Sequence, residues 1–141
     1  FLGGISGNAG LFSTAYEVSQ VYQMLLNGGE YEGQRYLSKE TCQLFTTETS
    51  KISRRGLGFD KPDAEDVGSS PCAPSAPVSV YGHTGFTGTC AWADPDNGLV
   101  YVFLSNRTYP DAWVNKLSNL EIREHIQETL YRALMQPAPV E

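Results

Sequence analysis

The chain has 141 residues and a formal net charge of −6, with a sequence pI of about 4.8. This length fits one domain or part of one, and 40% hydrophobic residues are enough for a core. The acidic balance argues against nucleic acid or anionic lipid as partners, and no apolar run approaches the roughly 18 residues of a membrane span.

The chain starts with Phe1-Leu2-Gly3-Gly4 and has no initiator Met, basic leader or cleavage site. We interpret it as a fragment, a processed chain or a trimmed piece. The three cysteines have no CxxC spacing, and the two histidines are far from each other and from any cysteine pair. We therefore expect unpaired thiols in the fold, no metal site and no cofactor.

The first periodic segment follows a glycine-rich loop over residues 1–10. Thr14 and Glu17 have the spacing of a capping box, and the next apolar residues recur at helical spacing as far as Leu25. Asn27 and the glycines after it end the pattern. These signals predict a helix over residues 14–27.

Weaker signals fill the next fifty residues. We expect a polar turn over 29–36, a second helix that Ser38 caps and that ends near Thr47, and a short strand over 57–59. Residues 60–77 contain four prolines and no periodicity, which predicts a long exposed loop.

Three strands follow, over residues 78–84, 89–94 and 99–104, and Asp94-Pro95-Asp96-Asn97-Gly98 predicts a tight hairpin loop. The third strand is apolar on both faces, which favours a central place in an antiparallel sheet. A last helix is expected over 116–135. Its predicted buried stripe is Ile122, Ile126, Leu130, Ala133 and Leu134. The fold class is thus α+β, with an antiparallel sheet flanked by helices.

The end of the strand predicted over residues 78–84 carries the clearest chemistry. In His83-Thr84-Gly85-Phe86 a strand meets a glycine turn, where Thr84 offers a hydroxyl and Gly85 lets a ligand approach the main chain. The N–H of Phe86 is placed to donate to an acyl oxygen, as an oxyanion hole requires. His83 is a candidate general base or electrostatic partner.

The order of motifs resembles the C-terminal region of class C β-lactamases and their relatives among serine esterases and D-alanyl peptidases. It runs from the glycine loop and Leu11-Phe12-Ser13-Thr14 to His83-Thr84-Gly85, the hairpin and residues 104–110 (Leu-Ser-Asn-Arg-Thr-Tyr-Pro). His83-Thr84-Gly85 stands where that superfamily has Lys-Thr-Gly. The resemblance covers nearly the whole chain and implies a partial β-lactamase/transpeptidase-like fold.

The resemblance also implies the site residues. The catalytic set is His83, Thr84, Gly85 and Phe86, and the substrate-binding set is Tyr81, Asn106, Arg107 and Thr108. Class C enzymes have amide side chains where this chain has Thr108 and Asp111, and a carboxylate there would repel the lactam carboxylate. This departure favours an esterase or peptidase over a β-lactamase proper.

No Ser-x-x-Lys and no Tyr-x-Asn occur in the chain, and Ser6-Gly7-Asn8 matches Ser-x-Asn only formally. The expected function is therefore one part of a metal-independent serine hydrolase that acts by acyl transfer on an ester, amide or β-lactam. Its nucleophile is expected in an absent N-terminal part.

Expected partners are a small-molecule or peptidoglycan-like substrate, and the missing N-terminal segment or a second copy. The resemblance implies a periplasmic or extracellular location. The alternative is a non-catalytic binding or interaction module on the same scaffold.

Overall fold

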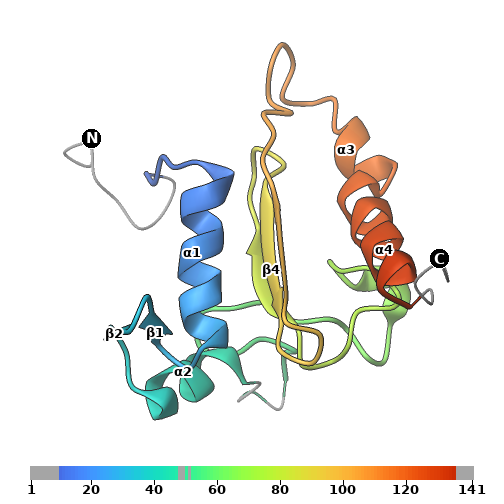
Figure 1. Cartoon of the computed structure of the whole chain (residues 1–141). Coiled ribbons are helices and arrows are strands. Elements are labelled where there is room, and N and C mark those ends of the chain that lie inside the picture. Colours follow the sequence, from blue (N-terminus) through green and yellow to red (C-terminus); the bar gives the residue numbers. More distant parts are fainter. Residues whose placement is uncertain (1–9, 48–49, 51, 136–141) are drawn as a thin grey trace, which may run out of the picture.

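The computed structural model describes residues 10–47, 50 and 52–135. Figure 1 shows an α+β architecture, as predicted from the sequence. The elements in chain order are α1 (Ala15–Leu26), β1 (Glu30–Tyr31), β2 (Gln34–Arg35), α2 (Lys39–Thr46), a 3-10 turn (Val67–Ser69), β3 (Tyr81–Thr84), β4 (Cys90–Asp94), β5 (Leu99–Phe103), α3 (Lys116–Asn119) and α4 (Ile122–Met135). The predicted glycine loop lies almost entirely outside the described residues.

Local capping explains where the first two helices begin. The Thr14 hydroxyl accepts a hydrogen bond from the Glu17 N–H at 3.2 Å, and the Glu17 carboxylate accepts one from the Thr14 N–H at 3.0 Å. Ser38 caps α2 by accepting from the Thr41 N–H at 3.1 Å. Each cap satisfies donors that the first helical turn leaves without a partner, so both helices are confirmed close to their predicted bounds.

A three-stranded antiparallel sheet forms the centre of the molecule, in the order β3-β4-β5. α1 covers one face of it and α4 the other (Figure 1). The predicted central place of the third strand is wrong, because β4 is central. Two hairpins in succession pair each strand with its neighbours in the sequence, so among the described strands β5 lies at an edge.

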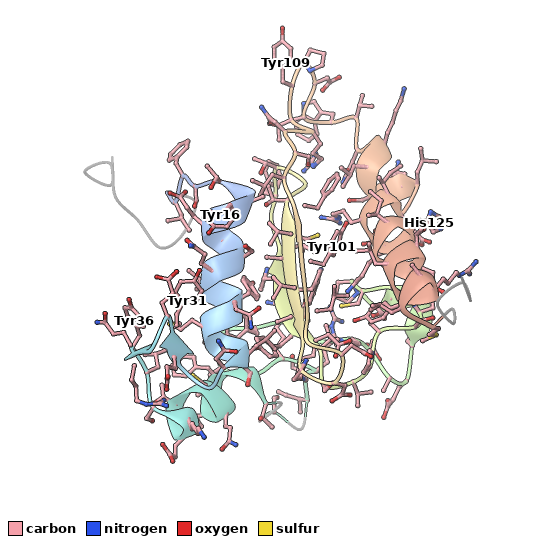
Figure 2. All side chains as sticks on the ribbon, viewed as in Figure 1. Tyr16, Tyr31, Tyr36, Tyr101, Tyr109 and His125 are labelled. Carbon is pink, nitrogen blue, oxygen red and sulfur yellow. The ribbon has the colours of Figure 1, made fainter. Side chains whose placement is uncertain are left out.

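The core lies mostly between the sheet and α4. It contains Cys72, Val80, Cys90, Trp92 and Tyr101, all nearly fully buried. Tyr101 points from β5 toward α4, while His125 lies on the outer side of that helix (Figure 2). The Tyr101 hydroxyl donates to the carbonyl of Arg123 at 3.2 Å, which ties the edge strand to the helix.

The predicted face of the last helix is wrong. The buried residues of α4 are Arg123, Gln127 and Tyr131, whereas the predicted stripe is partly exposed. Two of these three side chains have a close polar partner beneath the helix. Gln127 accepts from the Ala73 N–H at 2.9 Å, and the Tyr131 hydroxyl donates to Asp94 at 2.9 Å. Satisfied polar groups can be buried, so simple hydrophobic periodicity selected the wrong side.

The irregular segments also differ from the predictions. Residues 57–59 form no strand, and pairing with β3 is limited to an isolated bridge between Asp60 and Gly82. The loop over 60–77 is irregular as expected, yet Cys72 and Ala73 in it are buried. The polar turn over 29–36 contains the small hairpin of β1 and β2. The expected helix over 116–135 is two helices, separated near Glu121, which has φ 49°.

None of the helices in the described ranges is both long enough and apolar enough to cross a bilayer.

Candidate functional site

β3 carries the predicted motif to one end of the sheet. Alternate side chains of a strand point to opposite faces, so His83 shares the α1 face with Tyr81, and Thr84 lies on the other face. Among the described strands β3 lies at an edge, and the described part of the chain pairs with its outer edge only through the bridge at Gly82. A ligand that lies along this free edge can therefore reach both His83 and Thr84.

Two polar groups at the turn after β3 have no hydrogen-bond partner in the part of the chain that the structure describes. The Gly85 N–H donates to Thr89 at 2.7 Å, and the Gly88 N–H donates to Gly85 at 2.9 Å. Among the described residues, by contrast, neither the Phe86 N–H nor the Thr84 hydroxyl has a hydrogen-bond partner. Gly88 has φ 96°, a conformation that residues with side chains rarely adopt. The turn thus presents a backbone donor and a hydroxyl to the surface.

Arg107 holds this turn in place through hydrogen bonds to its backbone. Its Nε donates to the Phe86 carbonyl at 2.8 Å, and its backbone N–H donates to the Thr87 carbonyl at 2.9 Å. Its Nη1 donates to the Ala112 carbonyl at 2.8 Å, and the guanidinium lies 4.5 Å from the centre of the Phe86 ring. These bonds fix the position of the Phe86 carbonyl. A direct contact of Arg107 with substrate stays a prediction.

The residues that flank Arg107 in the sequence form hydrogen bonds with one another. The Thr108 hydroxyl donates to the side chain of Asn106 at 2.6 Å. Asp111 accepts from the Trp113 N–H at 2.9 Å. The segment after β5 is thus ordered largely by its own hydrogen bonds, and substrate binding by Asn106 and Thr108 also stays a prediction.

His83 has two polar contacts that the sequence did not reveal. Its Nδ1 lies 2.7 Å from the carbonyl oxygen of Thr84, and its Nε2 lies 3.4 Å from Nη1 of Arg55. Arg55 in turn reaches Asp60, with Nη2 3.3 Å from Oδ2. The pair Arg54-Arg55 was visible in the sequence. Its contact with the strand was not, because Arg55 and His83 are 28 positions apart.

Tyr81 lies at the other end of the strand from the turn. It is buried, it stacks on Tyr22 of α1 at 6.5 Å between ring centres, and its ring meets Phe59 edge-on at 5.3 Å. Burial raises the pKa of its hydroxyl. These contacts are those of a core residue, and its predicted contact with substrate stays a prediction.

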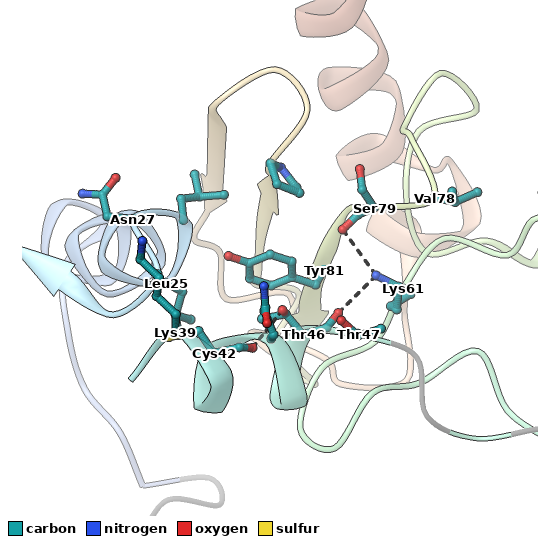
Figure 3. A pocket seen from close by; sticks show the side chains of 14 residues that line it. Leu25, Asn27, Lys39, Cys42, Thr46, Thr47, Lys61, Val78, Ser79 and Tyr81 are labelled. Atoms are coloured by element: carbon teal, nitrogen blue, oxygen red, sulfur yellow. Dashed lines mark hydrogen bonds between the residues drawn. The ribbon is translucent and has the colours of Figure 1, made fainter. Parts of the chain in front are cut away.

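Tyr81 also lines a hollow of about 780 Å³ between the end of α1, α2 and the start of β3 (Figure 3). Lys61 is buried there and its ammonium donates to the carbonyls of Thr46, Ser79 and Val80 at 3.1–3.3 Å. None of residues 83–88 lines this hollow. The candidate site is therefore an open edge of the sheet, distinct from this hollow.

The three thiols have the properties of structural residues. All are free and buried. Burial raises the pKa of each of them, that of Cys90 to about 11, so very little thiolate exists near neutral pH. In the part of the chain that the structure describes, no cluster of three His, Cys, Asp or Glu side chains is placed to hold a metal.

Comparisons with known proteins give a consistent result. The family model described as Beta-lactamase matches residues 2–122. The chain is 38% identical over 112 residues to a protein of Escherichia coli O157:H7 named "Putative D-alanyl-D-alanine carboxypeptidase". It is 37% and 36% identical to proteins of the same name from Escherichia coli K12 and Salmonella gallinarum. These matches cover 77% of this chain and 25% of each relative, so the chain spans about a quarter of their length.

Proposed function

This chain belongs to the beta-lactamase family of serine hydrolases, and on that basis we propose that it forms one wall of an acyl-transfer site. A serine outside residues 1–141 attacks the carbonyl of an ester, amide or lactam, the C–O or C–N bond to the leaving group breaks, and the leaving alcohol or amine takes up the proton of the serine. Water then hydrolyses the acyl-enzyme to the carboxylic acid and the free serine. His83, Thr84, Gly85 and Phe86 form the wall. The absence of Ser-x-x-Lys from this chain supports a nucleophile elsewhere in the protein.

The observation that carries the proposal is the free donor pair at the end of β3. As the serine attacks, the carbonyl oxygen becomes negative, and a fixed N–H aimed at it stabilises that charge more than it stabilises the substrate. The Phe86 N–H is free to do so. The Thr84 hydroxyl can bind a polar group of the substrate from the same free edge of β3.

Among acyl substrates, we favour a D-alanyl peptide. The relatives bear the name of a carboxypeptidase for the D-alanyl-D-alanine bond. Because such peptides belong to the cell wall, the proposal places the protein in the periplasm or on the outer cell surface.

The test compares the full-length protein with this chain. Both are treated with a fluorophosphonate and with a fluorescent penicillin, and labelled serines are located by peptide mass. We expect labelling of the full-length protein at one serine outside residues 1–141, and none of this chain. A full-length protein that neither probe labels contradicts the proposal and supports a non-catalytic binding module. Labelling within this chain, for example at Ser6, contradicts the proposed division of the site.

A further inference from the structure

Arg55 is a charged side chain that contacts the first residue of the strand motif. Its Nη1 is 3.4 Å from Nε2 of His83, the first residue of the His-Thr-Gly sequence. The Arg55 side chain is 53% exposed, so a ligand at the free edge of β3 can reach it. The family comparison and the sequence motif both leave this residue without a role.

Buried Asp60 holds the arginine at this position. Asp60 is 3% exposed, and its backbone pairs with Gly82 of β3. Its carboxylate accepts from Arg54 at 2.8 and 3.1 Å, from Arg55 at 3.3 Å and from the Lys61 N–H at 2.9 Å. A buried carboxylate with this many donors is fixed in place. Arg55 is thereby attached to the strand edge one residue before His83.

The two contacts of His83 select one form of its ring. The Thr84 carbonyl can only accept, so Nδ1 must carry a hydrogen and donate at 2.7 Å. A guanidinium can only donate, so Nε2 must accept from Arg55 through its lone pair. Only the neutral ring with hydrogen on Nδ1 meets both conditions. In this arrangement the positive charge at the start of the motif belongs to Arg55.

We propose that Arg55 is a specificity-determining residue, which supplies the positive charge at the start of His83-Thr84-Gly85 and directs the site toward acyl substrates with an anionic group. Neutral His83 orients the guanidinium, and Asp60 anchors it. This inference rests on the proposed function. It adds that the charge comes from a residue 28 positions upstream of the strand.

The test uses three variants of the full-length protein. Arg55→Lys keeps the charge, Arg55→Gln keeps a donor without charge, and Arg55→Met removes both. Acylation rates are measured with penicillin, which is anionic, and with a neutral aryl ester. The matched control is Arg132→Gln, which removes an exposed arginine paired with Glu128 on α4, far along the chain from the motif.

We expect Arg55→Gln and Arg55→Met to slow acylation by penicillin roughly 10- to 100-fold, which is what one charged hydrogen bond contributes. The neutral ester should lose less than about threefold with the same variants, since it has no group for the charge to bind. Arg55→Lys should keep most of the penicillin rate, and the control should keep both rates. Equal losses with the two substrates would overturn the inference, because a merely structural role affects both alike.

A second measurement does not depend on activity. Nitrogen-15 NMR of the His83 ring, assigned by its loss in His83→Gln, distinguishes the two neutral forms. We expect hydrogen on Nδ1 in the wild type, and a shifted Nε2 signal in Arg55→Met. Hydrogen on Nε2 in the wild type would overturn the inference even where the probes confirm the hydrolase. If instead no probe labels the wild type, the proposed function fails on its own evidence.

Discussion

The two ends of the three-stranded sheet differ in whether their polar groups have hydrogen-bond partners. At the end formed by the turn Asp94–Gly98, here termed the closed end, Asp94 accepts four hydrogen bonds. They come from the Asp96 N–H, the Asn97 N–H, the Asn97 side chain and the Tyr131 hydroxyl, at 2.8–3.2 Å. At the end formed by Gly85–Gly88, here termed the open end, the Phe86 N–H has no partner among the described residues, and the Phe86 side chain is 75% exposed.

Because of this difference, the closed end contributes to the stability of the fold, and the open end of the same strands is available for binding. A buried polar group without a partner costs free energy, so the closed end satisfies Asp94 completely beneath α4. A donor at the surface can bond to water and later exchange that water for a ligand. The open end can therefore keep a free donor at little cost to folding. Substitutions at the two ends should separate into effects on stability and effects on rate.

The largest effect is expected at the closed end. Asp94→Ala leaves the buried Tyr131 hydroxyl and the turn amides without their acceptor, and we expect it to lower the free energy of unfolding by about 3 kcal/mol. Urea unfolding followed by tryptophan fluorescence measures this, because Trp92 is buried in the same core. The control Asp96→Ala removes an exposed bond to Ser79 and should cost less than about 1 kcal/mol. Equal losses of unfolding free energy would show that the hydrogen bonds to Asp94 stabilise the fold no more than the exposed bond to Asp96 does.

At the open end we expect a change in rate without a change in stability. Thr84→Val keeps the shape and the β-branched side chain but removes the hydroxyl, and it should slow acylation of the full-length protein roughly 10- to 100-fold. Thr84→Ser keeps the hydroxyl and should keep most of the rate. Urea unfolding should be within about 0.5 kcal/mol of the wild type for both variants. A normal rate in Thr84→Val would remove this hydroxyl from the site.

The smallest effect concerns the loop that packs on α4 beside the closed end. Burial alone would raise the pKa of Glu128, but hydrogen bonds from Arg132 and Ser75 outweigh it and lower that pKa. A lowered pKa means that the charged form stabilises the fold above about pH 4.3, the usual unfolded value, and that this contribution is lost as the pH falls through the folded value.

Glu128→Gln should therefore cost about 1 kcal/mol at pH 7 and close to nothing near pH 3. Urea unfolding at the two pH values measures this difference. Glu65→Gln, at an exposed position in the same loop, is the matched control and should change stability by less than about 0.5 kcal/mol. A cost for Glu128→Gln that does not depend on pH would show that the charge of Glu128 is not the cause.

Some parts of the fold follow from residues close together in the sequence. The capping box of α1, the Ser38 cap of α2 and the hairpin loop after Asp94 each depend on contacts within about four residues. The strand motif was also found by sequence, because a strand end with a histidine, a hydroxyl and a glycine carries its chemistry in four successive positions. Its prediction needed no knowledge of what lies beside it.

Other parts of the fold depend on contacts between residues that are far apart in the sequence. The buried side of α4 was missed because Gln127 and Tyr131 are buried by bonding to Ala73 and Asp94, which are 54 and 37 positions away. Hydrophobic periodicity weighs only the side chains of the helix itself, so it favoured the stripe that begins at Ile122.

The sequence by itself determined the class of the fold, the order of its strands along the chain and the motif at the end of β3, because local caps, turns and periodicity specify these. Only the tertiary structure decided that β4 is central and that Arg55 meets His83. Both depend on which segments are neighbours in space, and the free energy of such pairings comes from partners tens of residues apart.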